Sequence, residues 1–232
     1  MQRRLENVDR GTRGELLSSL AEAIGVVTTE HPVRVAVDGP PAAGKTTLAD
    51  ELAVFLRSQG REIIRASIER FLLPQSQRYR RGEESAEGAY HDSFDFDALH
   101  RVLLDPLGPG GDRRFQPAIY DKATDRALSE PVMMASADAV LLFDGVFLLR
   151  PELIDEWDLS IFVSATFTET LDRARIRDQQ LYGSAAAVER RYCRRYIPSQ
   201  QFYFDTVRPT DRADVIVHND EPLQPAWETR RR

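Results

Sequence analysis

The spacing of four residues predicts a phosphate-binding loop. The pattern G-x-x-x-x-G-K-[ST] is met by Gly39, Gly44, Lys45 and Thr46. Glycine lets backbone N–H groups wrap around phosphate oxygens, where a Cβ atom would obstruct them. A lysine at this position reaches the β- and γ-phosphates of a nucleotide, and the threonine hydroxyl binds Mg²⁺. The residues predicted to bind a nucleoside triphosphate are Gly39, Pro40, Pro41, Ala42, Ala43, Gly44, Lys45, Thr46 and Thr47.

The segments on either side of this loop are those that the motif requires. The apolar, β-branched residues Val33, Val35 and Val37 predict a strand, and a helix is expected from about Gly44 to Ser58. The N-terminus of that helix would add its dipole and its free N–H groups to the same anion. An ordinary Gly-Pro turn between a strand and a helix is the alternative, and the flanking pattern favours the phosphate-binding loop.

Two carboxylates that follow other predicted strands could complete the chemistry. Glu69 comes after a strand predicted over Glu62–Ser67, and Asp144 ends the apolar run Ala139–Asp144, which resembles a Walker B strand. In open parallel sheets the ligand lies beyond the carboxyl ends of the strands. Phosphoryl transfer needs a carboxylate at the metal and another that orients or deprotonates the acceptor hydroxyl. Asp144 and Glu69 are predicted to take these roles; a strand-end cap and a solvated loop carboxylate are the alternatives.

Length and composition fit one large α/β domain. The chain has 232 residues, of which 42% are hydrophobic and 29% are charged, as in ordinary globular proteins. Its formal net charge of −6 argues against general nucleic-acid binding. We find no apolar run that could span a bilayer and no signal-peptide pattern, so we expect no membrane contact and a cytoplasmic location. Cys193, the only cysteine, cannot form an intrachain disulfide and is expected to be buried.

Alternating strands and helices predict the fold class. Leu159–Ser164 and Ala213–Val217 read as further strands, with helical patterns between them. The order, together with the phosphate-binding loop, predicts an α/β fold of the P-loop NTPase type, a parallel sheet with helices on both faces. Residues 74–93 are polar and too numerous for a plain connection, which predicts a functional loop or a partly disordered segment.

The expected organisation has three parts. An amphipathic pattern from about Thr12 to Val27 predicts a helix packed on the main domain. Polar, proline-containing sequence after residue 220 predicts a tail, which Trp227 could anchor in part. The parts are an N-terminal helix packed on the core (residues 1–30), a P-loop domain (31–220) and a C-terminal tail (221–232).

The ordered motifs resemble those of a known family. Residues 66–71 read A-S-I-E-R-F, residues 79–82 read Y-R-R-G, and residues 92–95 read D-S-F-D. Together with the P-loop, the Walker-B-like strand and an arginine-rich lid, they resemble the uridine kinase and phosphoribulokinase family of P-loop kinases. The resemblance covers about residues 33–218 and is greatest to a bacterial, uridine-kinase-like branch. It implies that residues 31–220 form a P-loop kinase domain with a helical lid at about 173–195. It also implies transfer of the γ-phosphate of ATP, with Mg²⁺, to a hydroxyl of a nucleoside or sugar-like small molecule.

The same resemblance suggests roles for individual residues. Glu69 stands where uridine kinases have an Asp that serves as the base. Asp95 matches an Asp that contacts the ribose of the acceptor, and Tyr120 with Asp121 matches a Tyr-Asp pair near the acceptor. Uridine kinases carry a His and an Arg after that pair, whereas this chain reads D-K-A-T-D-R over residues 121–126. In the lid, the arginines implied to stabilise the transferring phosphoryl group are Arg173, Arg175 and Arg177, with Arg173 and Arg177 preferred.

A second group of arginines lies further along the predicted lid. Arg190, Arg191, Arg194 and Arg195 recur at helical spacing. They could belong to the lid or to a site for a substrate phosphate, or they could form a solvated helical face. Five further side chains could stack on or hydrogen-bond to an acceptor, with surface or core packing as the alternative: Tyr90, His91, Tyr196, Gln200 and Tyr203.

Three hypotheses remain after these observations. The first is an ATP-dependent small-molecule kinase, with pantothenate, nicotinamide riboside and phosphorylated-sugar acceptors open beside nucleosides. The second is an ATP-binding regulatory or interaction protein with weak or lost transfer, which Glu69 in place of Asp and the missing His favour. The third is a GTP-driven switch. The sequence has no N-K-x-D run that would read guanine, which argues against it. Assembly into a homo-oligomer is also open.

Overall fold

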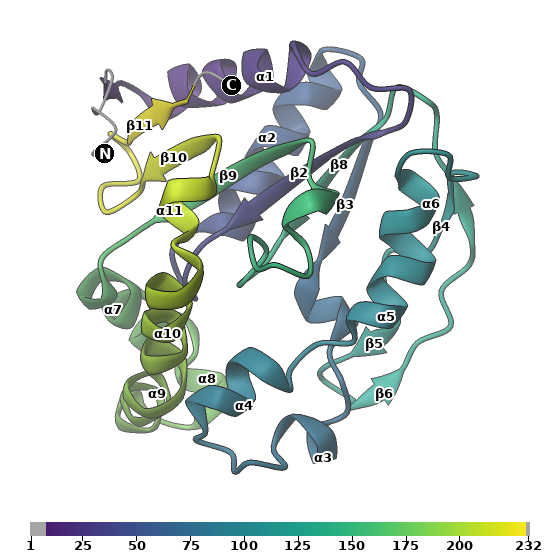
Figure 1. The fold of residues 1–232 in the computed structure, drawn as a ribbon. Coiled ribbons are helices and arrows are strands. Elements are labelled where there is room, and N and C mark those ends of the chain that lie inside the picture. Colours follow the sequence, from purple (N-terminus) through teal and green to yellow (C-terminus); the bar gives the residue numbers. More distant parts are fainter. Residues whose placement is uncertain (1–7, 231–232) are drawn as a thin grey trace.

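A seven-stranded sheet forms the centre of the molecule (Figure 1). The computed structural model describes residues 8–230. The strands lie in the order β1-β11-β10-β9-β2-β8-β3, and the five from β10 to β3 are parallel, as predicted. Their bounds are β1 Asp9–Arg10, β2 Val33–Asp38, β3 Ile63–Ser67, β8 Val140–Asp144, β9 Leu159–Ser164, β10 Val215–His218 and β11 Ala226–Thr229.

Helices cover both faces of this sheet. The α-helices are α1 Arg13–Gly25, α2 Lys45–Ser58, α3 Gln75–Arg78, α4 Ala86–His91, α5 Phe96–Leu99, α6 Asp105–Leu107, α7 Phe167–Arg177, α8 Gln179–Tyr182, α9 Ala185–Arg191, α10 Ile197–Val207 and α11 Pro209–Arg212. The 3₁₀ turns are η1 Ile68–Phe71 and η3 Ile154–Glu156, and the π-helical segments are η2 His100–Leu104 and η4 Tyr192–Tyr196. Two small ribbons pair β4 Arg114–Phe115 with β7 Met133–Met134, and β5 Tyr120–Asp121 with β6 Arg126–Ala127.

The two faces of the sheet follow from the alternation of side chains along each strand. On β2, Val35 and Val37 pack against α1 and α2 in one apolar cluster. Ala36 faces the other way and joins Phe143 and Tyr203 in a second cluster, under α5, η2 and α10. Burial on both faces explains why the parallel strands read as nearly continuous apolar runs. The predicted α/β fold is confirmed.

The predicted N-terminal helix is confirmed as α1. Thr12 caps it by accepting a hydrogen bond from the Glu15 N–H, and the Glu15 carboxylate accepts one from the Thr12 N–H in return. Leu16, Leu20 and Ile24 are buried, and they pack in the same cluster as α2. The first seven residues of the expected 1–30 segment lie outside the described residues.

The structure corrects the expectation of a C-terminal tail. Residues 226–229 form β11, which pairs antiparallel with β10 on one side and with β1 on the other. Trp227 lies opposite Val217 and is only 5% exposed, because its ring fills the cluster between the sheet and α1. Burial of this large ring explains why the strand forms although Pro222 and Pro225 precede it. The boundary expected at residue 221 therefore cuts through the sheet.

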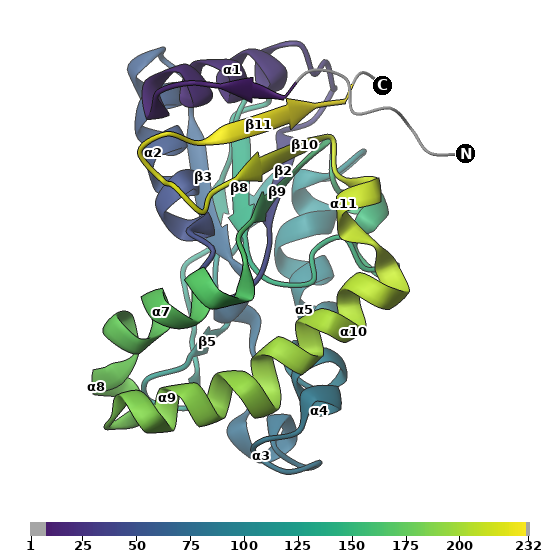
Figure 2. The ribbon, with the colours of Figure 1, turned by 90° about the vertical axis from the view of Figure 1, so that its left-hand side faces the viewer.

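The polar stretch 74–93 and the predicted lid enclose the space beyond one end of the sheet. Residues 74–93 form α3 and α4 rather than a plain loop, and α7, α8 and α9 form the lid segment (Figure 2). Cys193 in η4 is exposed, contrary to expectation, because it lies one helical turn after the exposed Glu189. Within residues 8–230, none of the helices has the length and apolar character needed to cross a bilayer.

Candidate active site

The loop after β2 has the conformation that its glycines predict. Gly39 and Gly44 have φ angles of 146° and 98°, which side chains with a Cβ rarely adopt. A Cβ on Gly39 would lie 2.3 Å from the Val163 carbonyl oxygen, and one on Gly44 would lie 2.5 Å from Asn219 Nδ2. The backbone is therefore free to wrap an anion at the N-terminus of α2.

Lys45 lies at the centre of this loop. Its Nζ donates a hydrogen bond to the Pro40 carbonyl at 2.7 Å. Burial lowers the pKa of Lys45 to about 8, against the attraction of the Asp38 and Asp144 carboxylates. The phosphates of a nucleotide would add negative charge next to this ammonium and so stabilise its charged form. The loop therefore fits a nucleotide.

Asp38 ties the loop to the rest of the fold. Its carboxylate accepts hydrogen bonds from the Gly39 N–H at 2.7 Å and from the Tyr203 hydroxyl at 2.6 Å. Burial raises the pKa of Asp38, and these hydrogen bonds oppose the rise. The same hydroxyl accepts a hydrogen bond from the Leu149 N–H. From the sequence, Tyr203 is a candidate acceptor contact. In the structure it links α10 to the loop.

Asp144 and Thr46 meet as predicted. Asp144 lies opposite Val37 in the pairing of β8 with β2, and Thr46 Oγ1 donates to its Oδ2 at 2.6 Å. Arg65 of β3 binds the other carboxylate oxygen at 2.9 Å. Among residues 8–230 no group of three His, Cys, Asp or Glu side chains could hold a metal alone. One carboxylate and one hydroxyl nevertheless fit Mg²⁺, which takes its other ligands from water and nucleotide phosphates.

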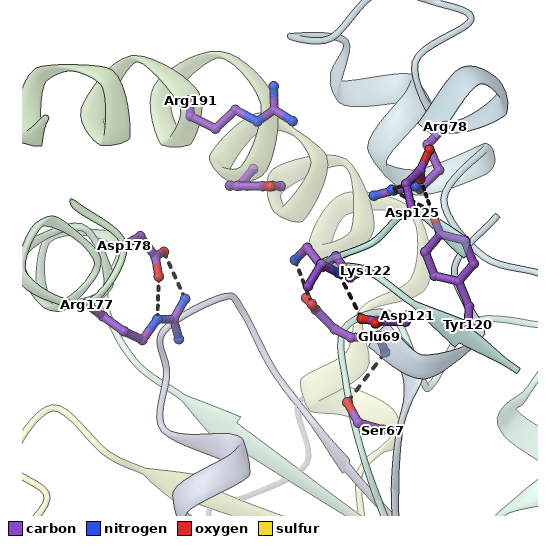
Figure 3. Close-up of polar contacts among 12 residues, drawn as sticks. Ser67, Glu69, Arg78, Tyr120, Asp121, Lys122, Asp125, Arg177, Asp178 and Arg191 are labelled. Atoms are coloured by element: carbon purple, nitrogen blue, oxygen red, sulfur yellow. Dashed lines mark hydrogen bonds and ion pairs between the residues drawn. The ribbon is translucent and has the colours of Figure 1, made fainter. Parts of the chain in front are cut away.

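Glu69 forms an ion pair that the sequence did not predict. The Lys122 ammonium lies 2.7 Å from Glu69 Oε2, and Figure 3 shows both side chains between the Arg177–Asp178 pair and Arg78. Desolvation lowers the pKa of Lys122, but attraction to Glu69 outweighs it and raises the pKa. The sequence did contain a signal for this ion pair: Lys122 directly follows the Tyr-Asp segment, and the chain has only one other lysine, Lys45.

The lid arginines separate into two environments. Arg177 lines the same cavity as Lys45 and binds Asp178 through two hydrogen bonds of 2.7 and 2.9 Å. Burial raises the pKa of Asp178, but Arg177 outweighs this and lowers it. Tyr192 donates to the same carboxylate and packs on Ala42 of the loop. Arg173 lies elsewhere, where it donates to the carbonyls of residues 219 and 220.

Of the predicted acceptor residues, Tyr196 and Gln200 line this cavity, whereas Asp95, Tyr120 and Asp121 do not. Asp95 caps α5 by accepting a hydrogen bond from the Ala98 N–H at 2.9 Å. The Tyr120 hydroxyl binds Asp125 and Arg78, and Asp121 accepts hydrogen bonds from the turn that follows it (Figure 3). The structure thus places these three side chains around the site, and direct contact with an acceptor stays a prediction.

One cavity of about 460 Å³ joins the loop, η1, residues 78–94 and the lid. This volume is in the range of small-molecule sites. The charged side chains that line it are the cations Lys45, Arg78, Lys122, Arg177 and Arg195 and the carboxylates Glu69, Asp144 and Asp178. Cations thus outnumber carboxylates by five to three.

Comparison with known proteins decides the family. Residues 34–220, most of the chain, match the model of the cytidylate kinase-like family. The chain belongs to this family. Uridine-cytidine kinase B of Dictyostelium discoideum is 30% identical over 192 residues, which cover 82% of this chain and 75% of that protein. A pantothenate kinase of Rhodopseudomonas palustris is 26% identical over 208 residues, which cover 84% and 64%.

Solved structures agree on the fold of this cytidylate kinase-like protein. A possible uridine kinase from Bacillus stearothermophilus superposes with a TM-score of 0.69 at 22% identity and covers 88% of this chain and 97% of that one. The resemblance to uridine-kinase-like P-loop kinases is therefore confirmed. The chain is a nucleotide-binding phosphotransferase that acts on a small molecule.

Proposed function

We propose that this protein transfers the γ-phosphate of ATP to a hydroxyl group of a nucleoside-like or sugar-like acceptor. The observation that carries the proposal is that one cavity is lined by Lys45, Thr46 and Asp144 and also by Glu69. The first three can hold a triphosphate and its metal, and Glu69 can receive the proton of an alcohol. A protein that only binds nucleotide has no need of the second carboxylate there.

The donor half of the cavity consists of the loop and Asp144. The backbone N–H groups of residues 42–47 and the Lys45 ammonium would bind the phosphates. Thr46 and Asp144, already 2.6 Å apart, would hold Mg²⁺. When bound, this metal neutralises charge that develops on the phosphate oxygens. Arg65 orients Asp144 through its second oxygen.

The transfer step needs a base for the acceptor hydroxyl and a cation near the oxygens of the transferring phosphoryl group. Glu69 orients the acceptor hydroxyl and takes its proton, while the hydroxyl oxygen forms a bond to the γ-phosphorus. The bond from that phosphorus to the β,γ-bridging oxygen breaks, and ADP leaves with that electron pair. Arg177 stabilises the negative charge of the phosphoryl group in transfer, and Asp178 holds its guanidinium in place.

The remaining predicted residues fit supporting roles in the same proposal. Asp95 fixes the start of α5, and Tyr120 with Asp121 fixes the ribbon that presents Lys122 to Glu69. Arg173 fixes α7 against the loop after β10. These contacts position the acceptor side rather than bind the reacting atoms.

The experiment that tests the proposal is ADP release from ATP and Mg²⁺ over nucleosides, sugars, sugar phosphates and vitamin precursors. We expect release that depends on one chemical class of acceptor. ATP binding without stimulated release by any class would contradict the proposal and favour the ATP-binding regulatory protein.

A further inference from the structure

Four arginines recur at helical spacing in α9 and η4; two of them are exposed and two are buried. Arg190 and Arg194 are exposed, and both guanidinium groups face the carboxylate of Glu84, at 3.7 and 2.7 Å. Arg191 and Arg195 are buried. One pair therefore forms a solvated face, and the other pair is turned into the protein.

Arg195 differs from Arg191 in having no counterion. The Arg191 guanidinium lies 2.9 Å from the Glu83 carboxylate. Arg195 is 3% exposed, and its hydrogen bonds go to neutral acceptors, the carbonyls of Glu83 and Ser85 and the Ser93 hydroxyl. Within residues 8–230, no carboxylate forms an ion pair with it.

A buried guanidinium without a counterion is costly, and Arg195 lines the cavity. Burial lowers its pKa, and the neighbouring charges of Arg191 and Arg78 act in the same direction. A guanidinium nevertheless keeps its proton at neutral pH, because its ordinary pKa is above 12. The positive charge therefore persists; its guanidinium lies 5.1 Å from the centre of the Tyr79 ring, and an anion in the cavity would balance it.

Gln200 supplies a second, independent observation in the same cavity. Its side chain is 1% exposed and lines the cavity, yet neither its amide nitrogen nor its amide oxygen has a hydrogen-bond partner among the described residues. Nearly all buried side-chain amides in folded proteins are hydrogen-bonded. An unpartnered amide that lines a cavity indicates a ligand group in front of it.

We propose that Arg195 and Gln200 bind an oxyanion carried by the acceptor, so that the substrate is a hydroxyl compound with a carboxylate or a phosphate ester. Arg78 lines the same cavity; its guanidinium pairs with Asp125 through one nitrogen, while its Nε is buried without a partner among the described residues. Glu69 has its own cation in Lys122, so it does not neutralise Arg195. The assignment of this ligand as the acceptor rests on the proposed kinase function; the anion site itself does not.

The first test measures anion binding without catalysis. The protein is saturated with a non-hydrolysable ATP analogue and Mg²⁺, so that the P-loop is occupied, and inorganic phosphate or acetate is then added. We expect one anion to raise the melting temperature by about 3 °C at ten times its dissociation constant. Phosphate alone would identify a phosphate ester, and acetate alone a carboxylate. The prior shift caused by the nucleotide reports separately on the donor site.

Two variants show whether the anion binds at the proposed residues. Arg195→Gln should lose the shift, while the matched control Arg194→Gln, on the exposed face, should keep it. Gln200→Met is nearly isosteric and removes an unpartnered amide, so it should weaken the shift without loss of stability. Equal shifts in wild-type protein and both cavity variants, or no shift with either anion, would overturn the proposal.

The second test uses acceptor pairs that differ only in the anion. Glycerate is compared with glycerol, pantothenate with pantothenol, and ribose 5-phosphate with ribose, by acceptor-dependent ADP release. We expect turnover with an anionic member and little with its neutral partner. Arg195→Gln should lower kcat/KM for the anionic acceptor by about 10- to 100-fold, mainly through KM. Preference for neutral members would overturn the anion site, whereas anion binding without any release would contradict only the kinase function.

Discussion

The donor half and the acceptor half of the cavity differ in how far their polar groups are satisfied. In the donor half, Thr46 and Arg65 already bind both oxygens of Asp144, and Lys45 binds a carbonyl. In the acceptor half, Arg195 has no counterion and Gln200 no hydrogen-bond partner among the described residues. We infer that the loop around Lys45 is arranged for a nucleotide before one binds, whereas the buried charge of Arg195 gains a counterion only when an anionic ligand is present.

The largest expected effect is in the donor half. Lys45→Ala should lower kcat by about 10⁴-fold, because it removes the cation at the transferring phosphate. Steady-state ADP release measures the loss. The melting curve is the control and should stay cooperative, since the ammonium contacts only a carbonyl of its own loop. Turnover close to that of the wild type would remove the P-loop from the mechanism.

A smaller effect is expected at Glu69, where the two halves meet. Glu69→Gln should lower kcat by about 10²- to 10³-fold through loss of the base, with an unchanged dissociation constant for ATP. The exposed Glu87, paired with Arg81, offers the matched control Glu87→Gln. An unchanged rate in Glu69→Gln would place the base elsewhere. Glu69→Asp then tests whether the shorter carboxylate of the uridine kinases works better here.

The pH dependence of ATP binding tests whether the pKa of Lys45 is lowered. Its pKa of about 8 means that the free protein holds an ammonium below pH 8 and an amine above it. ATP binds the ammonium, so the dissociation constant should rise about tenfold from pH 7 to pH 9. Isothermal titration measures this, and Lys45→Arg should abolish the dependence. Because the chain has two lysines, ¹³C-methylation would also report both pKa values directly. A flat profile in wild-type protein would contradict the lowered pKa.

The smallest expected effect is on stability, at Tyr203, which supports the donor half from α10. Tyr203→Phe removes a hydrogen bond to the buried Asp38 carboxylate and leaves the Leu149 N–H unpaired. The free energy of unfolding should fall by about 1 to 3 kcal/mol. Urea denaturation measures the change. An unaltered midpoint would show that this link between α10 and the P-loop contributes nothing to stability.

The donor half could be predicted from the sequence because its signals are local. The glycines, Lys45 and Thr46 lie within one loop, and a Walker-B-like run ends at Asp144. Pairing of two adjacent parallel strands then brings Asp144 to Thr46. The fold class was predictable for the same reason, since apolar runs alternate with amphipathic helices along the chain.

The acceptor half and the last strand depend on contacts between distant segments. Asp95 has the residue type of an acceptor contact and equally of a helix cap, and the structure shows the cap. Helical spacing defines the rows of Arg190 with Arg194 and of Arg191 with Arg195, but it does not tell which row faces inward. Residues 226–229 form a strand that pairs with β10 and β1 and buries Trp227 against α1, and these partners lie far away in the sequence.

The fate of the γ-phosphate shows directly whether the protein transfers it to the hydroxyl of an acceptor. The protein is incubated with [γ-³²P]ATP, Mg²⁺ and a fraction of cellular metabolites, and the products are separated by chromatography. The proposed function predicts that the label moves into an organic phosphate ester, and that Lys45→Ala forms none. Label that remains in ATP, or that appears only as inorganic phosphate, would contradict transfer to an acceptor hydroxyl.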